Sequence, residues 1–244
     1  MTALPASSPL IVRLRAQIAA IERRGAGAMH AALPFGVAAL DTALPGGGLA
    51  RGALHEISGG ARDPHHAAAA TLFAAGIAAR LGESAPVLWC VTRRDLFAPG
   101  LAAVGLHPDG LIHAEAGNDA GVLQAVEEGV RHSGLAAVVG EVRRLPLVAA
   151  RRLQLAAENS GVTVLMLLRG DREAEPGAAL TRWEVEAGPS TTMSRALWRV
   201  RLVRARGAAA GEWLVEGCDA QGRLAVLAAL VDRPVAAEPR AHAA

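Results

Sequence analysis

The stretch LDTALPGGGLARGALHEISGG, residues 40–60, decides the fold. It opens with a helical turn at residues 40–44, passes through a glycine hinge at 46–48 and enters a short apolar strand at 53–57. The strand leads directly into Gly59 and Gly60. A strand, a glycine-rich loop and a helix N-terminus in succession are the geometry of a phosphate cradle. Glycine clusters alone indicate only a turn-rich loop.

Apolar runs of strand length alternate with helical segments beyond this stretch. We predict strands at residues 87–91, 111–116, 135–142 and 162–168, and helices at 63–80, 118–132 and 147–159. Continuous apolar strands separated by helices of about 10–15 residues are typical of a parallel sheet covered on both faces. Strand-like runs without helices between them, at 181–187, 196–206 and 212–217, then predict an antiparallel extension of that sheet.

Length and composition indicate one α/β domain. The chain has 244 residues, of which 52% are hydrophobic, and this is enough for one substantial core. We expect the domain at residues 33–231, with an N-terminal helix and linker at 1–32 and a loose tail at 232–244. Apolar residues at helical spacing predict that the N-terminal helix is amphipathic over residues 9–25. Packing on another subunit and folding back on its own domain are both open to it.

The charged residues and cysteines exclude several classes of chemistry. All 25 basic residues are Arg, so no Lys is present to form a Schiff base, act as a general base or neutralise phosphates. Cys90 and Cys218 are far apart and predict two reduced thiols rather than a zinc site or a disulfide. The sequence contains neither a secretory signal nor an apolar run of about 18 residues, which predicts a soluble cytoplasmic protein without membrane contact.

A family resemblance is carried by residues of the quoted stretch and by segments further along the chain. Leu40-Asp41, Gly47-Gly48-Leu49, Glu56-Ile57 and Gly59 resemble the approach to the phosphate-binding loop of RecA-type recombinases. VLWCVTRRDLFAPGLAAVGLHPDGL, RRLQLAAENSGVTVLMLL and a Trp-rich end make the chain most similar to the ImuA family of bacterial damage-inducible mutagenesis. The resemblance implies a RecA-like core: a mostly parallel sheet flanked by helices, an antiparallel C-terminal strand extension and an N-terminal helix.

The phosphate-binding loop departs from the spacing G-x-x-x-x-G-K-[ST] that nucleotide binding needs. Counting from Gly59, Pro64 stands at the second Gly, His65 at the Lys and His66 at the Ser/Thr. Proline contributes no N–H to a cradle, and a neutral His is a poor replacement for a permanent cation. We therefore interpret Gly59, Gly60 and these three residues as a degenerate loop and expect no cofactor and no metal.

The carboxylates of an ATPase are missing as well. At the end of the strand at 135–142, Gly140 takes the position of the metal-linked Asp. Glu141 follows one residue later and should point to the opposite face of the strand. After the strand at 87–91, the first carboxylate is Asp95. We therefore predict that the protein has no catalytic residues and is not an enzyme.

Two clusters of arginines are candidate surfaces for DNA or a protein partner. The first surrounds Trp198 and comprises Arg195, Arg199, Arg201, Arg204 and Arg206. By resemblance to RecA, the last two match cationic residues that reach the nucleotide of a neighbouring subunit. The second cluster comprises Arg143, Arg144, Arg151 and Arg152. The first cluster suits DNA phosphates or an acidic partner, and the alternative for it is a charged face that protects a strand against edge pairing. By resemblance to RecA, the second cluster lies near a DNA-facing loop, which is short in this chain.

The resemblance to the ImuA family implies a function that needs no catalysis. We expect a RecA-like adaptor (a pseudo-ATPase) in SOS-induced, error-prone translesion DNA synthesis and DNA repair. The implied partners are the polymerase-like ImuB, an alternative replicative polymerase and RecA. Two alternatives stay open: a divergent DNA-dependent ATPase, and a SulA-type inhibitor that binds the division GTPase.

Overall fold

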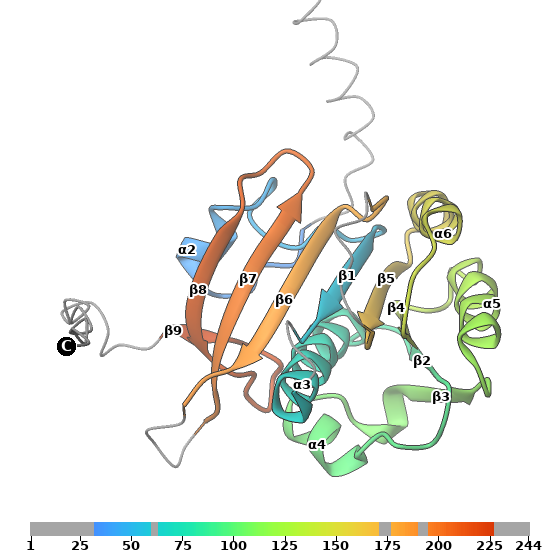
Figure 1. Ribbon diagram of the computed structural model, residues 1–244, viewed down its shortest axis with the longest axis horizontal. Helices are drawn as coiled ribbons and strands as arrows, with labels where there is room; N and C mark the ends of the chain where they lie inside the picture. The colour runs from blue at the N-terminus through green and yellow to red at the C-terminus, as the bar shows by residue number, and fades with distance from the viewer. Residues whose placement is uncertain (1–31, 60–62, 171–176, 190–194, 227–244) are drawn as a thin grey trace, which may run out of the picture.

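The computed structural model describes residues 32–59, 63–170, 177–189 and 195–226, so the predicted N-terminal helix and the tail at 232–244 lie outside the described residues. Within these residues the strands form one sheet in the order β3-β2-β4-β5-β1-β6-β7-β8-β9 (Figure 1). The strands are β1 (Leu54–Ser58), β2 (Val87–Val91), β3 (Leu111–Glu115), β4 (Ala137–Val142), β5 (Thr163–Leu168), β6 (Thr181–Ala187), β7 (Leu197–Ala205), β8 (Gly211–Glu216) and β9 (Ala225–Val226). The helices are α2 (Ala38–Asp41), α3 (Pro64–Leu81), α4 (Ala98–Ala103), α5 (Asp119–Val130) and α6 (Leu147–Ser160), with a 3₁₀ turn at Pro108–Gly110.

The α/β fold with a mostly parallel sheet is confirmed. Each predicted strand, and each predicted helix from residue 63 onward, is found within two residues of its expected ends, whereas the helical turn expected at 40–44 is α2 at Ala38–Asp41. One detail of the topology differs. The sequence predicts that the antiparallel extension begins with the strand at 181–187. In the structure, β6 pairs parallel with β1, and the antiparallel pairing begins with β7. The 12-residue connection from Leu168 to Thr181 explains this, because a dozen residues are enough for the chain to cross over and re-enter the sheet in the same direction.

Helix α3 begins at Pro64 because Asp63 caps it. The Asp63 side chain accepts a hydrogen bond from the backbone N–H of His65. Proline is tolerated at the first helical position because an N–H there would have no partner within the helix. Alanines and Gly76 line the helix, so its backbone can approach its neighbours closely. A Cβ on Gly76 would collide with Cys218, which shows how tightly the chain after β8 packs on α3.

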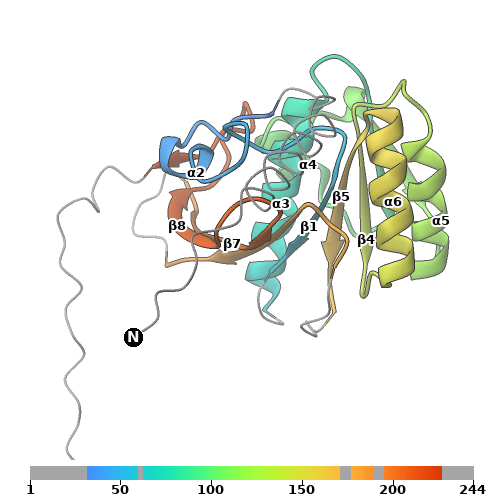
Figure 2. The same cartoon turned by 90° about the horizontal axis from the view of Figure 1, so that it is seen from above.

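The two faces of the sheet bury separate apolar clusters. On one face, α3 and the segment around α2 pack on the sheet, and Phe35, Phe73 and Trp183 meet with ring centroids 5.4–5.9 Å apart. On the other face, α5 and α6 cover the part of the sheet formed by β2, β4 and β5, with Val126, Leu153 and Met166 at its centre (Figures 1 and 2). Helices α5 and α6 lie away from β7 and β8, whose outer face carries charged residues instead.

A buried histidine fastens β1 to β6. His55 Nε2 donates to the carbonyl of Ala50 at 2.8 Å, and its Nδ1 accepts from the Thr181 hydroxyl at 2.7 Å. The Thr181 oxygen in turn accepts from Trp183 Nε1 at 2.7 Å. Complete burial lowers the pKa of His55 from 6.5 to about 4, against the smaller opposing effect of the Ala50 hydrogen bond. The imidazole is therefore neutral in the folded protein.

We predict that acid destabilises the fold through His55. Its pKa is lower in the folded chain than in the unfolded chain, so the unfolded chain binds more protons between pH 6.5 and about 4. The free energy of unfolding should therefore fall as the pH drops through this range, by up to about 3 kcal/mol from this group. Urea titrations at a series of pH values measure the loss, and His55→Gln should flatten it. An NMR titration of the His55 ring with a midpoint near 6.5 in the folded protein would contradict the assignment.

Candidate functional site

The candidate site lies at the carboxyl edge of the parallel strands. The ends of β1, β4 and β5 meet there with the N-terminus of α3, although these elements are far apart in the sequence. Open α/β sheets bind ligands outside the carboxyl ends of their strands. The predicted degenerate loop and both positions considered for the metal-linked carboxylate belong to this edge.

The N-terminus of α3 is already occupied by a carboxylate of the chain itself. Asp63 Oδ1 accepts from His65 N at 2.7 Å, and the Asp63 carbonyl accepts from Ala67 N at 3.0 Å. Pro64 has no N–H to offer. An incoming phosphate would therefore find the N–H groups of His65 and Ala67 already used and a negative charge beside them.

The two histidines of the loop diverge, as adjacent residues on a helix do. His65 is exposed at the start of α3, whereas His66 Nδ1 accepts from the backbone N–H of Ala187 at the end of β6, at 3.2 Å. Gly59 lets the end of β1 approach the first turn of α3, since a Cβ there would lie 2.8 Å from the backbone carbon of His66. Gly60 lies outside the described residues. The described loop residues thus hold α3 to the sheet.

An ion pair between Glu141 and Arg169 ties the strand ends to α3. Glu141 Oε2 accepts from Arg169 Nε at 2.9 Å and from Nη2 at 2.6 Å. The guanidinium also donates to the carbonyl of Ala67 at 3.0 Å and to the Thr71 hydroxyl at 2.7 Å, both on α3. The other carboxylate oxygen accepts from the indole N–H of Trp89 at 2.8 Å. We call these five residues the Arg169 clamp.

The clamp changes the sequence interpretation of the carboxylate position. Gly140 was matched to the metal-linked Asp, with Glu141 expected on the opposite face of β4. The two residues do lie on opposite faces of β4, and Glu141 is the one on the face covered by α3. A Cβ on Gly140 would instead meet Val126 of α5 at 2.6 Å. The carboxylate that points toward α3 is therefore present, and Arg169 occupies it.

The described residues of this edge do not fit the phosphates and metal of a bound nucleotide. The carboxylate that would hold a metal accepts two hydrogen bonds from a permanent cation. The helix N–H that would face a phosphate is capped by Asp63. Asp95, the carboxylate predicted after the second strand, pairs with Arg93 on the surface at 2.8 Å.

Carboxylates of neighbouring strands neutralise the first arginine cluster. On the outer face of β6 and β7, Arg201 pairs with Glu184, and Arg199 lies 3.7 Å from Glu186 and 3.4 Å from Glu212. The hydrogen bond to Glu184 raises the pKa of Arg201. These are cross-strand pairs of opposite charge, which stabilise a sheet face that has no helix on it.

The remaining members of this cluster do not form one basic surface. Arg204 donates to the carbonyl of Gly177 at 2.5 Å, Arg195 pairs with Glu216, and Arg206 is exposed. Trp198 is buried, with only 2% of its surface exposed. Its inclusion in a DNA or partner surface was wrong, because alternation along β7 turns it into the core beside Val200.

The second cluster leads onto an exposed face of α6. Arg143 lies 3.6 Å from Asp119 and is largely exposed, as is Arg144. Arg152 pairs with Glu127 of α5 at 2.9 Å. Near these arginines, α6 exposes 68% of the Val148 side chain and 59% of the Leu155 side chain. Exposed large apolar side chains next to arginines are more typical of a protein contact than of a DNA backbone contact.

Known proteins place the chain in a family. It is 33% identical over 207 residues to Protein ImuA of Caulobacter vibrioides strain NA1000 / CB15N, covering 77% of this chain and 84% of the relative. The same values hold for Protein ImuA of strain ATCC 19089 / CIP 103742 / CB 15. The chain belongs to the ImuA family. It matches no family model.

Sequence reasoning missed the Arg169 clamp of this ImuA-family chain. Arg169 directly follows the predicted strand at 162–168, and Glu141 ends the neighbouring one. Two opposite charges at the carboxyl ends of neighbouring parallel strands were the available signal, but the sequence does not show that β4 and β5 are neighbours. Val148 and Leu155 were missed because they follow the helical spacing of a core.

Burial disfavours the thiolate form of both cysteines of the ImuA-family chain. Both thiols are free, and burial raises the pKa of Cys90 and of Cys218 to about 12. In the part of the chain that the structure describes, no group of three or more His, Cys, Asp or Glu side chains is placed to hold a metal. Within the same residues, no helix is long and apolar enough to cross a membrane.

We predict that breaking the Arg169 clamp costs more stability than breaking an exposed ion pair. Glu141→Ala leaves a guanidinium that is only 26% exposed without its carboxylate and should lower the free energy of unfolding. We expect a loss of about 2 kcal/mol, less than the about 3–5 kcal/mol of a fully buried pair because Arg169 keeps some contact with water. Urea denaturation measures the change.

The matched control for this prediction is Glu115→Ala, which breaks an exposed pair with Arg94 at the same edge of the sheet. It should change stability by less than about 0.5 kcal/mol. Equal effects of the two substitutions would contradict a structural role for the clamp.

Proposed function

We propose that the chain is a non-catalytic, RecA-like adaptor in SOS-induced, error-prone translesion DNA synthesis. Membership of the ImuA family supports involvement in damage-inducible mutagenesis. The observation that carries the adaptor role is the ion pair between Glu141 and Arg169. Arg169, bound by Glu141 and by α3 at the carboxyl edge, occupies the position where a nucleotide phosphate and its metal ion would have to bind.

The degenerate loop supports the same proposal. With Pro64 at the second glycine position and Asp63 capping α3, the loop has lost donors that a phosphate cradle needs and has gained a negative charge. The chain also has no Lys to neutralise the phosphates. In this proposal, the protein acts through contacts made by its RecA-like surface and does not hydrolyse ATP.

The surface that suits a protein partner best is the outer face of α6. Val148, Arg151 and Leu155 are three and four residues apart, so they lie on one side of the helix. No ion pair of Arg151 is found within the described residues. We propose that this face contacts ImuB, an alternative DNA polymerase or RecA. The paired arginines of β7 stabilise the sheet and do not bind a partner in this proposal.

Affinity capture tests the adaptor role and its surface together. Tagged protein is recovered from DNA-damaged cells with nuclease present, so that partners held by DNA alone are lost. We predict recovery of ImuB, the alternative polymerase or RecA. The double substitution Val148→Asp with Leu155→Asp should reduce that recovery at least about tenfold, since both side chains would bury apolar area in the contact.

The control for this capture is Phe97→Asp, which places a charge on a similarly exposed aromatic side chain at the start of α4, on the opposite face of the sheet from α6. Unchanged recovery in this variant separates the α6 face from a general effect of surface charge. Recovery of the division GTPase in place of the polymerases would instead support the SulA-type alternative.

Induced mutagenesis in cells separates the adaptor from the ATPase alternative. His65 stands at the Lys position of the loop and is exposed, and among the described residues its one hydrogen bond outside the helix runs from its backbone N–H to the Asp63 cap. We predict that deletion of the gene abolishes damage-induced mutation, while His65→Ala leaves its frequency unchanged within about twofold. A loss of induced mutation in His65→Ala, at normal protein level, would favour a divergent ATPase.

A further inference from the structure

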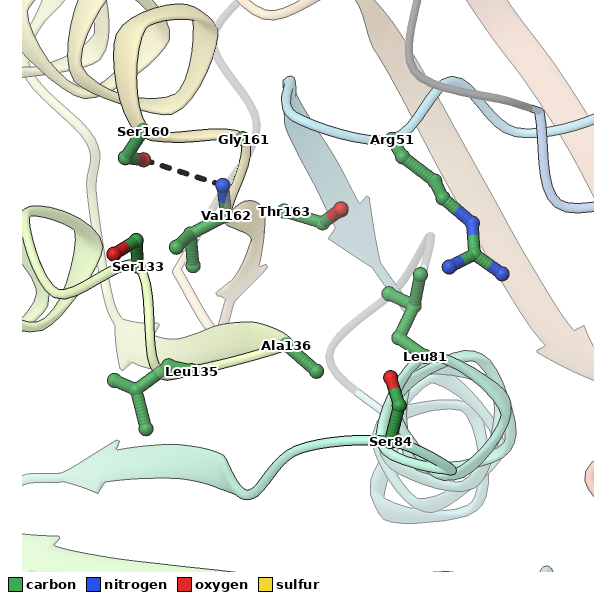
Figure 3. A pocket seen from close by; sticks show the side chains of 10 residues that line it. All are labelled: Arg51, Leu81, Ser84, Ser133, Leu135, Ala136, Ser160, Gly161, Val162 and Thr163. Carbon is green, nitrogen blue, oxygen red and sulfur yellow. Dashed lines mark hydrogen bonds between the residues drawn. The ribbon is translucent and has the colours of Figure 1, made fainter.

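A polar pocket opens at the edge of the sheet opposite to the Arg169 clamp. It has a volume of about 230 Å³ and lies where β4 and β5 begin and where α3 and α6 end. Arg51 reaches it from the loop before β1, Ser84 from the turn after α3, and Thr163 from the first residue of β5 (Figure 3). Ser160 and Gly161 close it from the end of α6. The proposed function uses none of these residues.

The hydroxyl groups of the pocket have protons to donate. The Thr163 oxygen accepts from the backbone N–H of Gly52 at 3.1 Å, and the Ser160 oxygen accepts from Val162 N at 3.2 Å. Because a hydroxyl carries one donor, each of these groups still has its proton available after accepting. Figure 3 shows the Thr163 and Ser84 hydroxyls on the side of the pocket that faces the Arg51 side chain.

Arg51 brings an uncompensated positive charge into this pocket. Its side chain is half-buried, and its Nε is buried with no hydrogen-bond partner among the described residues. Within the described residues, the guanidinium makes neither a hydrogen bond nor an ion pair. A charged group without an acceptor is unfavourable in a partly buried place, so an acceptor that reaches the guanidinium from the pocket would be stabilised here.

The surrounding helix ends decide which anion fits. Helices α3 and α6 both end at the pocket, and the partial negative charge of their last carbonyls favours the arginine and opposes added negative charge. A doubly charged phosphate is therefore less suitable than a group with one charge. A guanidinium and a carboxylate match in shape through two parallel hydrogen bonds. The pocket is also smaller than the about 300–1,000 Å³ of typical cofactor sites.

We infer that this pocket is a carboxylate-binding site, in which Arg51 pairs with the carboxylate and the hydroxyls of Thr163 and Ser84 donate to it. The carboxylate comes from an acidic side chain of a protein partner or from a free carboxylic acid. Arg51 is the residue that determines binding, because it alone supplies charge. The site lies at the opposite edge from the clamp and does not depend on the adaptor proposal.

An NMR titration of the full chain tests the site. Acetate, succinate, the capped peptide Ac-Gly-Glu-Gly-amide and inorganic phosphate are each added at constant ionic strength set with sodium chloride. We expect saturable shifts of the Gly52 and Gly161 amide signals with the carboxylates. Arg51→Gln should weaken binding at least about tenfold, as expected for the loss of a charge-assisted pair. Arg93→Gln removes an exposed charge at the far edge and should leave the affinity unchanged.

The probes also distinguish the source of the carboxylate. Tighter binding of the peptide than of succinate indicates an acidic side chain of a partner, and the reverse order indicates a free acid. Ser84→Ala, a mild change at an exposed position, should weaken binding by about threefold and keeps the test valid if Arg51→Gln does not fold. Non-saturable shifts, equal shifts in Arg51→Gln, or tighter binding of phosphate than of any carboxylate would overturn the inference.

Discussion

The ion pair between Glu141 and Arg169 is the interaction on which the carboxyl edge of the sheet depends. It joins the ends of β4 and β5 to the first turns of α3, three elements that the chain reaches at widely separated points. Each hydrogen-bonding atom of the guanidinium is used, so the group is fixed rather than free to meet a ligand. A half-buried charge of this kind is stable only while its partner remains, which couples the sheet to the helix.

The rest of the molecule divides into two parts with different physical roles. The parallel part of the sheet is buried on both faces, so most of its strands are continuous apolar runs. From β6 onward the outer face is charged, and arginines are matched by glutamates across the strands. Balanced charge stabilises this face of the sheet. The unbalanced features are elsewhere, on α6 and in the pocket of Arg51.

Much of the fold could be predicted from local patterns. The strand at 87–91 and the capped helix after Asp63 are visible in the sequence because apolar runs and capping residues act over a few neighbours. The sequence did not predict β9 and α4, because a two-residue strand and a six-residue helix carry too little periodic signal. The parallel direction of β6 was not predicted either, because it depends on where the chain re-enters the sheet.

The site could be predicted only in part. The loss of the loop residues at Pro64 and His65 is a matter of spacing and is plain in the sequence. The pairing of Glu141 with Arg169 is a contact between residues 28 positions apart, created by the order of the strands, and no local pattern contains it. Likewise, Trp198 looked like part of a basic surface until its neighbours in the sheet were known.

Calorimetric titration of the full chain with ATP and magnesium tests the central claim most directly. If Arg169 and Asp63 occupy the carboxyl edge, no saturable heat of binding develops at millimolar nucleotide, with or without single-stranded DNA. Binding in the micromolar range that is weakened by a single substitution at His65 would show that the edge still accepts phosphates. That result would contradict the account of the clamp and of the adaptor built on it.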